Sequence, residues 1–79
     1  MLTMKKLLDK FVEVYNYLYE HPQMPVPGYA EAIKDFDNML ATPVGKVFIR
    51  TFVEYRGDAV TSDREAAAFI FALRSCENP

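Results

Sequence analysis

Proline and glycine divide this chain of 79 residues into four segments, and each segment has the pattern of one amphipathic helix. The breaks fall at a proline-rich stretch over residues 22–28, at Pro43 and at Gly57. Within each segment apolar residues recur three and four positions apart, which is the spacing of one helical face. The pattern therefore predicts an all-α fold: a single domain over residues 1–79, built as a compact bundle of about four helices whose short connections favour antiparallel neighbours.

The expected helices are about Thr3–Glu20, Gly28–Ala41, Pro43–Arg56 and Asp63–Ser75. His21 precedes a proline, which disfavours the helical conformation and ends the first helix. Thr42 has the side chain of an N-cap, and Gly57 suits a helix stop. Ser62 and Glu65 are three apart, as in a capping box, so they predict the start of the fourth helix.

The third segment is open to two interpretations. A helix would place one apolar stripe on the core, and its members are Val44, Val47, Phe48, Phe52 and Tyr55. The β-branched residues over 47–53 would also suit a strand. A lone strand is unstable unless it pairs across a dimer. The capping signals and the stripe favour the helix.

Composition excludes several classes of protein. Hydrophobic residues make up 51% of the chain and charged residues 25%, which is typical of a folded domain. The single cysteine, Cys76, rules out a disulfide within the chain, and one histidine beside it makes a metal site improbable. Neither a signal peptide nor a membrane-spanning run is predicted, so we expect a cytoplasmic protein with no membrane contact.

No catalytic constellation is predicted. His21 stands at the end of a helix with no orienting partner in the sequence pattern, so it is interpreted as a surface residue. Cys76 falls near a helix C-terminus, whose dipole opposes a thiolate. We therefore expect a protein that is not an enzyme and that needs no cofactor or metal.

Large apolar residues outside the core stripes are the best functional signal. Four such residues occur on the predicted helices: Tyr17, Ile49, Val53 and Phe71. Arg64 and Arg74 lie near Phe71 on the helical wheel, and aromatic residues beside arginine are typical of interface anchors. These six residues are the candidate partner-binding residues. The alternative is that the third helix is central and apolar nearly all round, which would make Ile49 and Val53 core residues.

The leading hypothesis is a small protein-binding module, an adaptor or inhibitor that docks on a larger protein or complex. Small helical domains of this kind are common among phage and mobile-element proteins that block a host defence complex. An acidic cluster is a possible second surface, and its members are Glu31, Asp35, Asp37 and Asn38. A homodimer through Ile49 and Val53 is a related possibility, since so small a core gains from association.

A nucleic-acid-associated regulator is the alternative from another class, with phosphate contacts from Lys5, Lys6 and Lys10. The formal net charge of −2 provides no basic stripe, so nucleic acid is an unlikely partner. A helix-turn-helix formed by the last two helices is disfavoured as well. Its reading helix would present Asp63 and Glu65, with only Arg64 and Arg74 as cations.

Overall fold

The computed structural model describes residues 2–23 and 26–77, and this part of the chain forms four helices without a strand. They are α1 (Met4–Glu20), α2 (Tyr29–Leu40), α3 (Pro43–Arg56) and α4 (Asp63–Glu77). The all-α prediction is confirmed, and the ambiguous third segment is a helix. Within the described ranges no helix combines the length and the apolar character needed to cross a membrane.

The helix ends follow the capping chemistry of the sequence. Thr3 Oγ1 accepts a hydrogen bond from the Lys6 amide at the start of α1. Ser62 Oγ accepts the Glu65 amide at 3.1 Å, which begins α4 as the capping box predicted. At the end of α3, Gly57 adopts φ +82°, a left-handed conformation that glycine reaches without a steric penalty.

A sharp corner joins α2 to α3, and it depends on Thr42 and Gly45. Thr42 Oγ1 donates to the Met39 carbonyl at the end of α2 and accepts from the Gly45 amide at 3.0 Å. A Cβ atom at position 45 would collide with that carbonyl and lie 2.7 Å from Thr42 Oγ1. Only glycine therefore allows the first turn of α3 to approach the end of α2 this closely. The prediction that consecutive helices run antiparallel is therefore wrong for α2 and α3.

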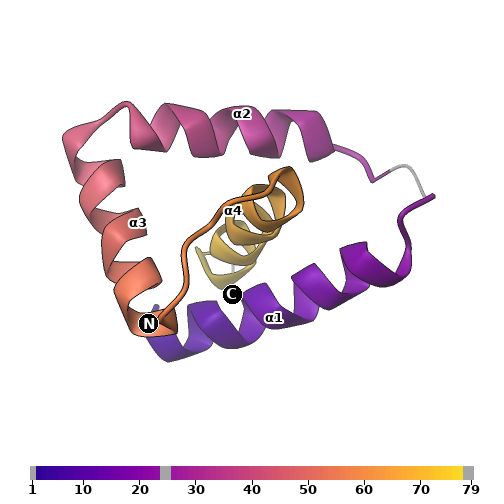
Figure 1. Ribbon diagram of the computed structural model, residues 1–79, viewed down its shortest axis with the longest axis horizontal. Helices are drawn as coiled ribbons and strands as arrows, with labels where there is room; N and C mark the ends of the chain where they lie inside the picture. Colours follow the sequence, from indigo (N-terminus) through magenta and orange to yellow (C-terminus); the bar gives the residue numbers. More distant parts are fainter. Residues whose placement is uncertain (1, 24–25, 78–79) are drawn as a thin grey trace.

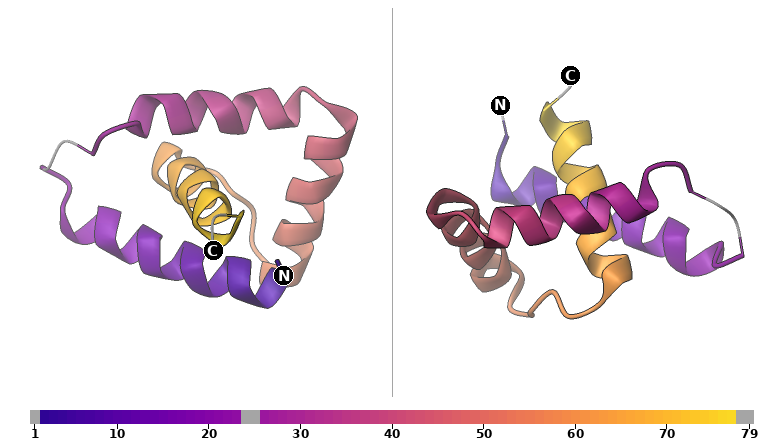
Figure 2. Two further views of the ribbon diagram at one scale, coloured as in Figure 1. Left: turned by 180° about the vertical axis from the view of Figure 1, so that it is seen from behind. Right: turned by 90° about the horizontal axis from the view of Figure 1, so that it is seen from above.

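The fourth helix runs through the middle of the molecule. Figure 1 shows α4 almost end-on, with α1 and α2 on opposite sides of it and α3 closing a third side, and the view from above in Figure 2 agrees. Six residues of α4 are buried: Ala66, Ala67, Ala68, Phe69, Ile70 and Ala72. The alanines let neighbouring helices approach closely, and they cover more than one side of α4. The central helix is thus α4, where the sequence had suggested the third helix.

Aromatic rings fill the space between α3 and α4. The ring of Phe69 on α4 makes edge-to-face contacts with Phe36, Phe48 and Phe52, with centroids 5.7, 6.1 and 5.0 Å away. Phe52 also meets Phe11 of α1 at 5.2 Å. Edge-to-face geometry is the favoured arrangement of such rings. Phe69 therefore contacts both α2 and α3 from the centre of the core.

The buried face of α3 differs from the predicted one. Gly45, Ile49 and Phe52 are buried, whereas Val44, Val47 and Tyr55 are 81%, 54% and 51% exposed. The predicted stripe and the observed one differ by a rotation of the helix about its axis. The close approach at Gly45 fixes this rotation, because the glycine must face α2.

Arg56 ties three helices together. Its guanidinium lies 2.9 Å from Glu65 Oε2 at the start of α4 and 4.8 Å from the centre of the Phe11 ring of α1. The same group donates to the Ala59 carbonyl at 3.4 Å, which restrains the connection between α3 and α4. Arg56 is therefore a structural residue rather than a surface cation.

Candidate binding surfaces

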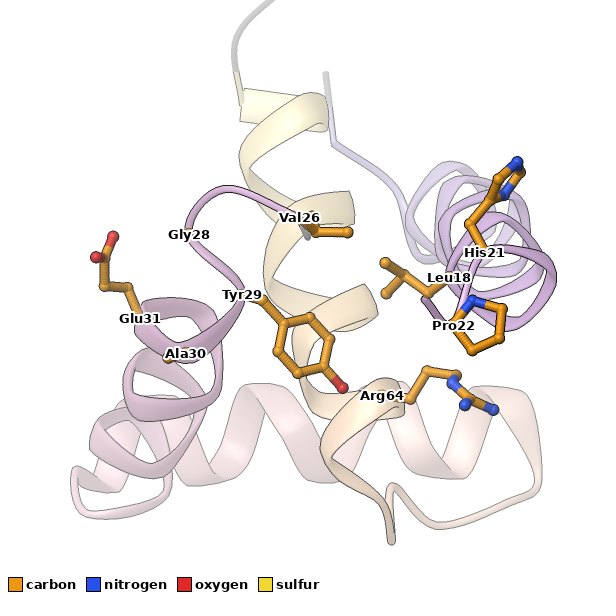
Figure 3. Close-up of a pocket in the computed structure, with 9 residues that line it drawn as sticks. All are labelled: Leu18, His21, Pro22, Val26, Gly28, Tyr29, Ala30, Glu31 and Arg64. Atoms are coloured by element: carbon orange, nitrogen blue, oxygen red, sulfur yellow. The ribbon is translucent and has the colours of Figure 1, made fainter. Parts of the chain in front are cut away.

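A cleft of about 540 Å³ opens between the C-terminal end of α1 and the N-terminal end of α2. Its apolar lining includes Leu18 of α1, Val26 of the connector and the ring of Tyr29 on α2. Figure 3 shows Leu18 and Val26 facing each other across the opening, with α4 behind them. His21, Pro22 and Arg64 lie along the opposite rim from Glu31. The cleft is open to solvent and has the size and apolar lining of small binding sites.

Helix ends set the two walls of the cleft. On the first wall, the His21 ring stacks on Tyr17 at 4.4 Å, and its Nδ1 lies 2.8 Å from the Tyr17 carbonyl. On the second wall, Gly28 takes φ +79° and starts α2 without a side-chain cap. The first turn of α2 lies at this wall, and Glu31 in the same turn partly offsets the positive end of the helix dipole.

Arg64 brings a positive charge to the rim. Its guanidinium carbon lies 5.1 Å from the centre of the Tyr19 ring, and among the described residues it takes part in no ion pair. The carboxylate of Glu31 points away from the opening in Figure 3. The arginine beside exposed tyrosines favours a negatively charged group at this side of the rim.

His21 is the histidine of the rim, and its ring is held by its own helix. The His21 ring is oriented by a backbone carbonyl rather than by a carboxylate. A general base requires an orienting group and a second catalytic group within reach. Across residues 2–23 and 26–77 no group of three metal-ligating side chains comes together.

The six residues selected from the sequence do not form one surface. Arg64 lines the cleft, and Tyr17, 48% exposed, supports its wall through His21. Phe71 is half-buried and reaches to 3.9 Å from where a Cβ of Gly28 would lie, so it packs beneath the cleft instead of projecting outward.

The other three residues serve the fold. Ile49 is 5% exposed and belongs to the core, so its prediction as a partner contact is wrong for the monomer described here. Val53 is partly buried and packs against the same core. Arg74 pairs with Asp35 of α2, which joins the acidic cluster to α4. For Ile49 and Val53 the alternative interpretation, as core residues, is the one that the structure supports.

Sequence reasoning missed the most exposed apolar side chains. Val44, Val47, Thr51 and Tyr55 follow one another along the outer side of α3, and we call these four residues the α3 row. Val44, Val47 and Tyr55 were assigned to the core because they share one helical face. The glycine at position 45 was the signal that could have corrected the assignment, because a glycine inside a helix often marks a close approach.

The lysines of the nucleic-acid hypothesis are partly neutralised. Lys5 pairs with Asp9 at 3.0 Å and Lys10 pairs with Glu13 at 3.1 Å, each within one turn of α1. Such pairs reduce the positive potential that phosphate binding requires.

Comparison with protein-family models, with curated proteins and with solved structures finds no significant match to this chain.

Proposed function

We propose that this chain is a non-enzymatic protein-binding module that docks on a larger protein as an adaptor or inhibitor, with the α1–α2 cleft as its recognition site. The observation that carries the proposal is the cleft itself: an apolar interior of Leu18, Val26 and Tyr29 beside an arginine that has no ion pair in the described part of the chain. Apolar interiors with a few directed polar groups are the usual form of a binding site.

The occupant is a segment of the partner that carries a large apolar side chain next to an acidic residue. The apolar side chain would fill the cleft, and its burial contributes about 1.5–3 kcal/mol. The acidic residue would meet Arg64 on its rim of the cleft, where the guanidinium favours negative charge. The two features lie on the same cleft, so one short segment satisfies both.

Exposed tyrosines extend the recognition surface beyond the cleft. Tyr17 and Tyr19 are 48% and 63% exposed on the last turns of α1. Tyrosine and arginine are enriched among the residues that contribute most to protein interfaces. Their position beside the cleft supports a surface in which an anchored side chain is surrounded by aromatic contacts.

In the inhibitor form of the proposal, a phage or mobile-element protein occupies a host defence complex and blocks it stoichiometrically. No covalent or catalytic step is required for this action. The activity of the partner complex would therefore fall in proportion to occupancy of the cleft.

Filling the cleft provides a direct test. Ala30 is exposed and lines the cleft, so Ala30→Trp would occupy it without removing a core side chain. Lys34→Trp adds the same group one turn further along α2, outside the cleft lining, and is the matched control. Each bait is used to capture proteins from the native host, after circular dichroism shows equal helicity.

A partner retained by wild type and by Lys34→Trp, but lost with Ala30→Trp and weakened by Arg64→Glu, supports the proposal. Equal capture by all four baits would remove the cleft from the recognition site. Calorimetry with the purified partner then gives the stoichiometry, for which the proposal requires one site per chain.

A further inference from the structure

The outer side of α3 carries apolar residues that no other helix covers. Val44 is 81% exposed, and Val47 and Tyr55 are 54% and 51% exposed. Figure 2 shows α3 at the edge of the molecule, with the other three helices on its inner side. Exposed apolar groups aligned along one helix face are typical of a helix–helix interface.

Two charged side chains border the α3 row on the same flank. At about 100° per residue, Arg50 and Glu54 both fall beside the row on its side away from Phe48. Both are exposed, and neither takes part in an ion pair within residues 2–23 and 26–77. The flank therefore presents a positive charge followed, one turn later, by a negative charge.

Arg50 and Glu54 could pair with Glu54 and Arg50 of a second copy whose α3 runs in the opposite direction. A two-fold axis through Thr51 would place Val47 of one chain level with Tyr55 of the other. Glu54 of the second chain would then lie about 3 Å along the axis from Arg50 of the first, given a rise of about 1.5 Å per residue. An antiparallel pair aligns equivalent flanks, so two identical Arg50–Glu54 pairs would form, one on each side of the axis. The two Arg50 residues have the same axial offset, but Arg50 lies further round the helix from the row than Glu54, so the opposite charges are the closer pair.

We propose that the α3 row is a self-association surface, on which a second copy of this chain docks its own α3 in antiparallel orientation about Thr51. The contact buries Val47, Thr51 and Tyr55 of the two rows against each other, and the flanking charges set direction and register. A domain of this size gains from such burial because its own core is small. The inference is independent of the cleft, which lies at the junction of α1 and α2.

The mass of the protein in solution tests the proposal first. Sedimentation equilibrium should show a concentration-dependent rise from the 9.1 kDa of one chain toward twice that mass. Val47→Glu should hold the protein at the mass of one chain, whereas Ala30→Trp in the cleft should leave association unchanged. A single-chain mass up to about 1 mM, a concentration at which weak contacts of about 4 kcal/mol register, would overturn the proposal.

Charge reversal tests the register. Arg50→Glu and Glu54→Arg each place like charges opposite one another at two symmetric positions, and each should weaken association about tenfold. The double variant Arg50→Glu/Glu54→Arg restores opposite charges and should recover the wild-type affinity. Association that is indifferent to all three variants would contradict the antiparallel register. Thermal unfolding at low concentration checks that each variant still folds.

Disulfide trapping tests the direction of the two helices. In a Cys76→Ala background, Thr51→Cys should form a crosslinked dimer under mild oxidation, because the two-fold axis brings equivalent positions together. Val44→Cys should not crosslink, since antiparallel pairing separates the two copies by about 20 Å along the axis. Efficient crosslinking at both positions would indicate parallel helices and overturn the proposed arrangement.

Discussion

The guanidinium of Arg56 pairs with the carboxylate of Glu65 at 2.9 Å, with only 20% and 12% of the two side chains exposed. This pair connects the end of α3 to the start of α4 across the turn at Gly57. The other oxygen of this carboxylate, Oε1, accepts hydrogen bonds from the Thr61 amide at 3.3 Å and from the Ser62 hydroxyl at 3.1 Å. Glu65 is therefore both part of the helix cap and the partner of the arginine that contacts α1.

Removing the Glu65 charge should destabilise the fold. Glu65→Gln leaves the Arg56 guanidinium largely buried without its counter-charge, so the free energy of unfolding should fall by about 2 kcal/mol. Asp9→Asn is the matched control, because the Lys5–Asp9 side chains are 77% and 66% exposed and such pairs contribute little to stability. Urea unfolding measures both variants. Equal losses would show that the Arg56–Glu65 pair has no special role.

Acid should weaken the protein through the same residue. Burial by itself would raise the pKa of Glu65, but hydrogen bonds from Arg56, Thr61 and Ser62, together with the Arg56 charge, lower it below its usual value of 4.5. A lowered folded-state pKa means that the carboxylate stabilises the fold fully above about pH 4.5 and loses this effect as the pH falls through the folded-state pKa. Unfolding free energies measured between pH 7 and pH 3 should decline less steeply for Glu65→Gln than for wild type.

Gly45→Ala should disrupt the corner between α2 and α3. The added methyl group would meet the Met39 carbonyl and Thr42 Oγ1, and the backbone must shift to accommodate it. We expect a loss of about 1–3 kcal/mol despite the better helix propensity of alanine. Lys46→Ala, at the adjacent exposed position, should change stability by less than about 0.5 kcal/mol. A neutral Gly45→Ala would show that the two helices do not need this close approach.

Phe69→Ala should be the most damaging of these substitutions. The side chain is completely buried and its ring contacts three other phenylalanine rings, so the loss is about 3–5 kcal/mol. Phe71→Ala, two residues along α4 and only half-buried, should cost clearly less. Thermal unfolding by circular dichroism compares the two. A larger effect at Phe71 would place the centre of the core nearer the cleft than the structure does.

The elements of the fold were predictable because their determinants are local. Helix starts depend on a side chain and an amide three positions apart, as at Thr3, Thr42 and Ser62. The predicted ends agree with the structure to within two residues, and the last helix extends slightly further, to Glu77. Of the connector, Pro22 and Gln23 form a turn, and Met24 and Pro25 lie outside the described residues.

The surfaces were less predictable, because exposure depends on where helices meet. Ile49 and Val44 are both apolar residues of one helix, and only the packing at Gly45 decides that the first is buried and the second exposed. The cleft joins residues of α1, the connector, α2 and α4, so no sequence spacing could reveal it. Tyr17 and Arg64 are related to the cleft only through neighbours, because Tyr17 stacks on His21 and Arg64 lies over the ring of Tyr19.

The sequence by itself determined the limits of the four segments and favoured a helix in each, since caps, breakers and periodicity act within a few residues along the chain. Tertiary structure alone decided that α4 is the central helix, that α3 turns Val44 and Val47 outward, and that a cleft opens beside Arg64. The physical reason is that packing is settled by contacts between segments far apart in sequence. A close approach at one glycine and a set of interlocking phenylalanine rings fixed which faces remained free to bind.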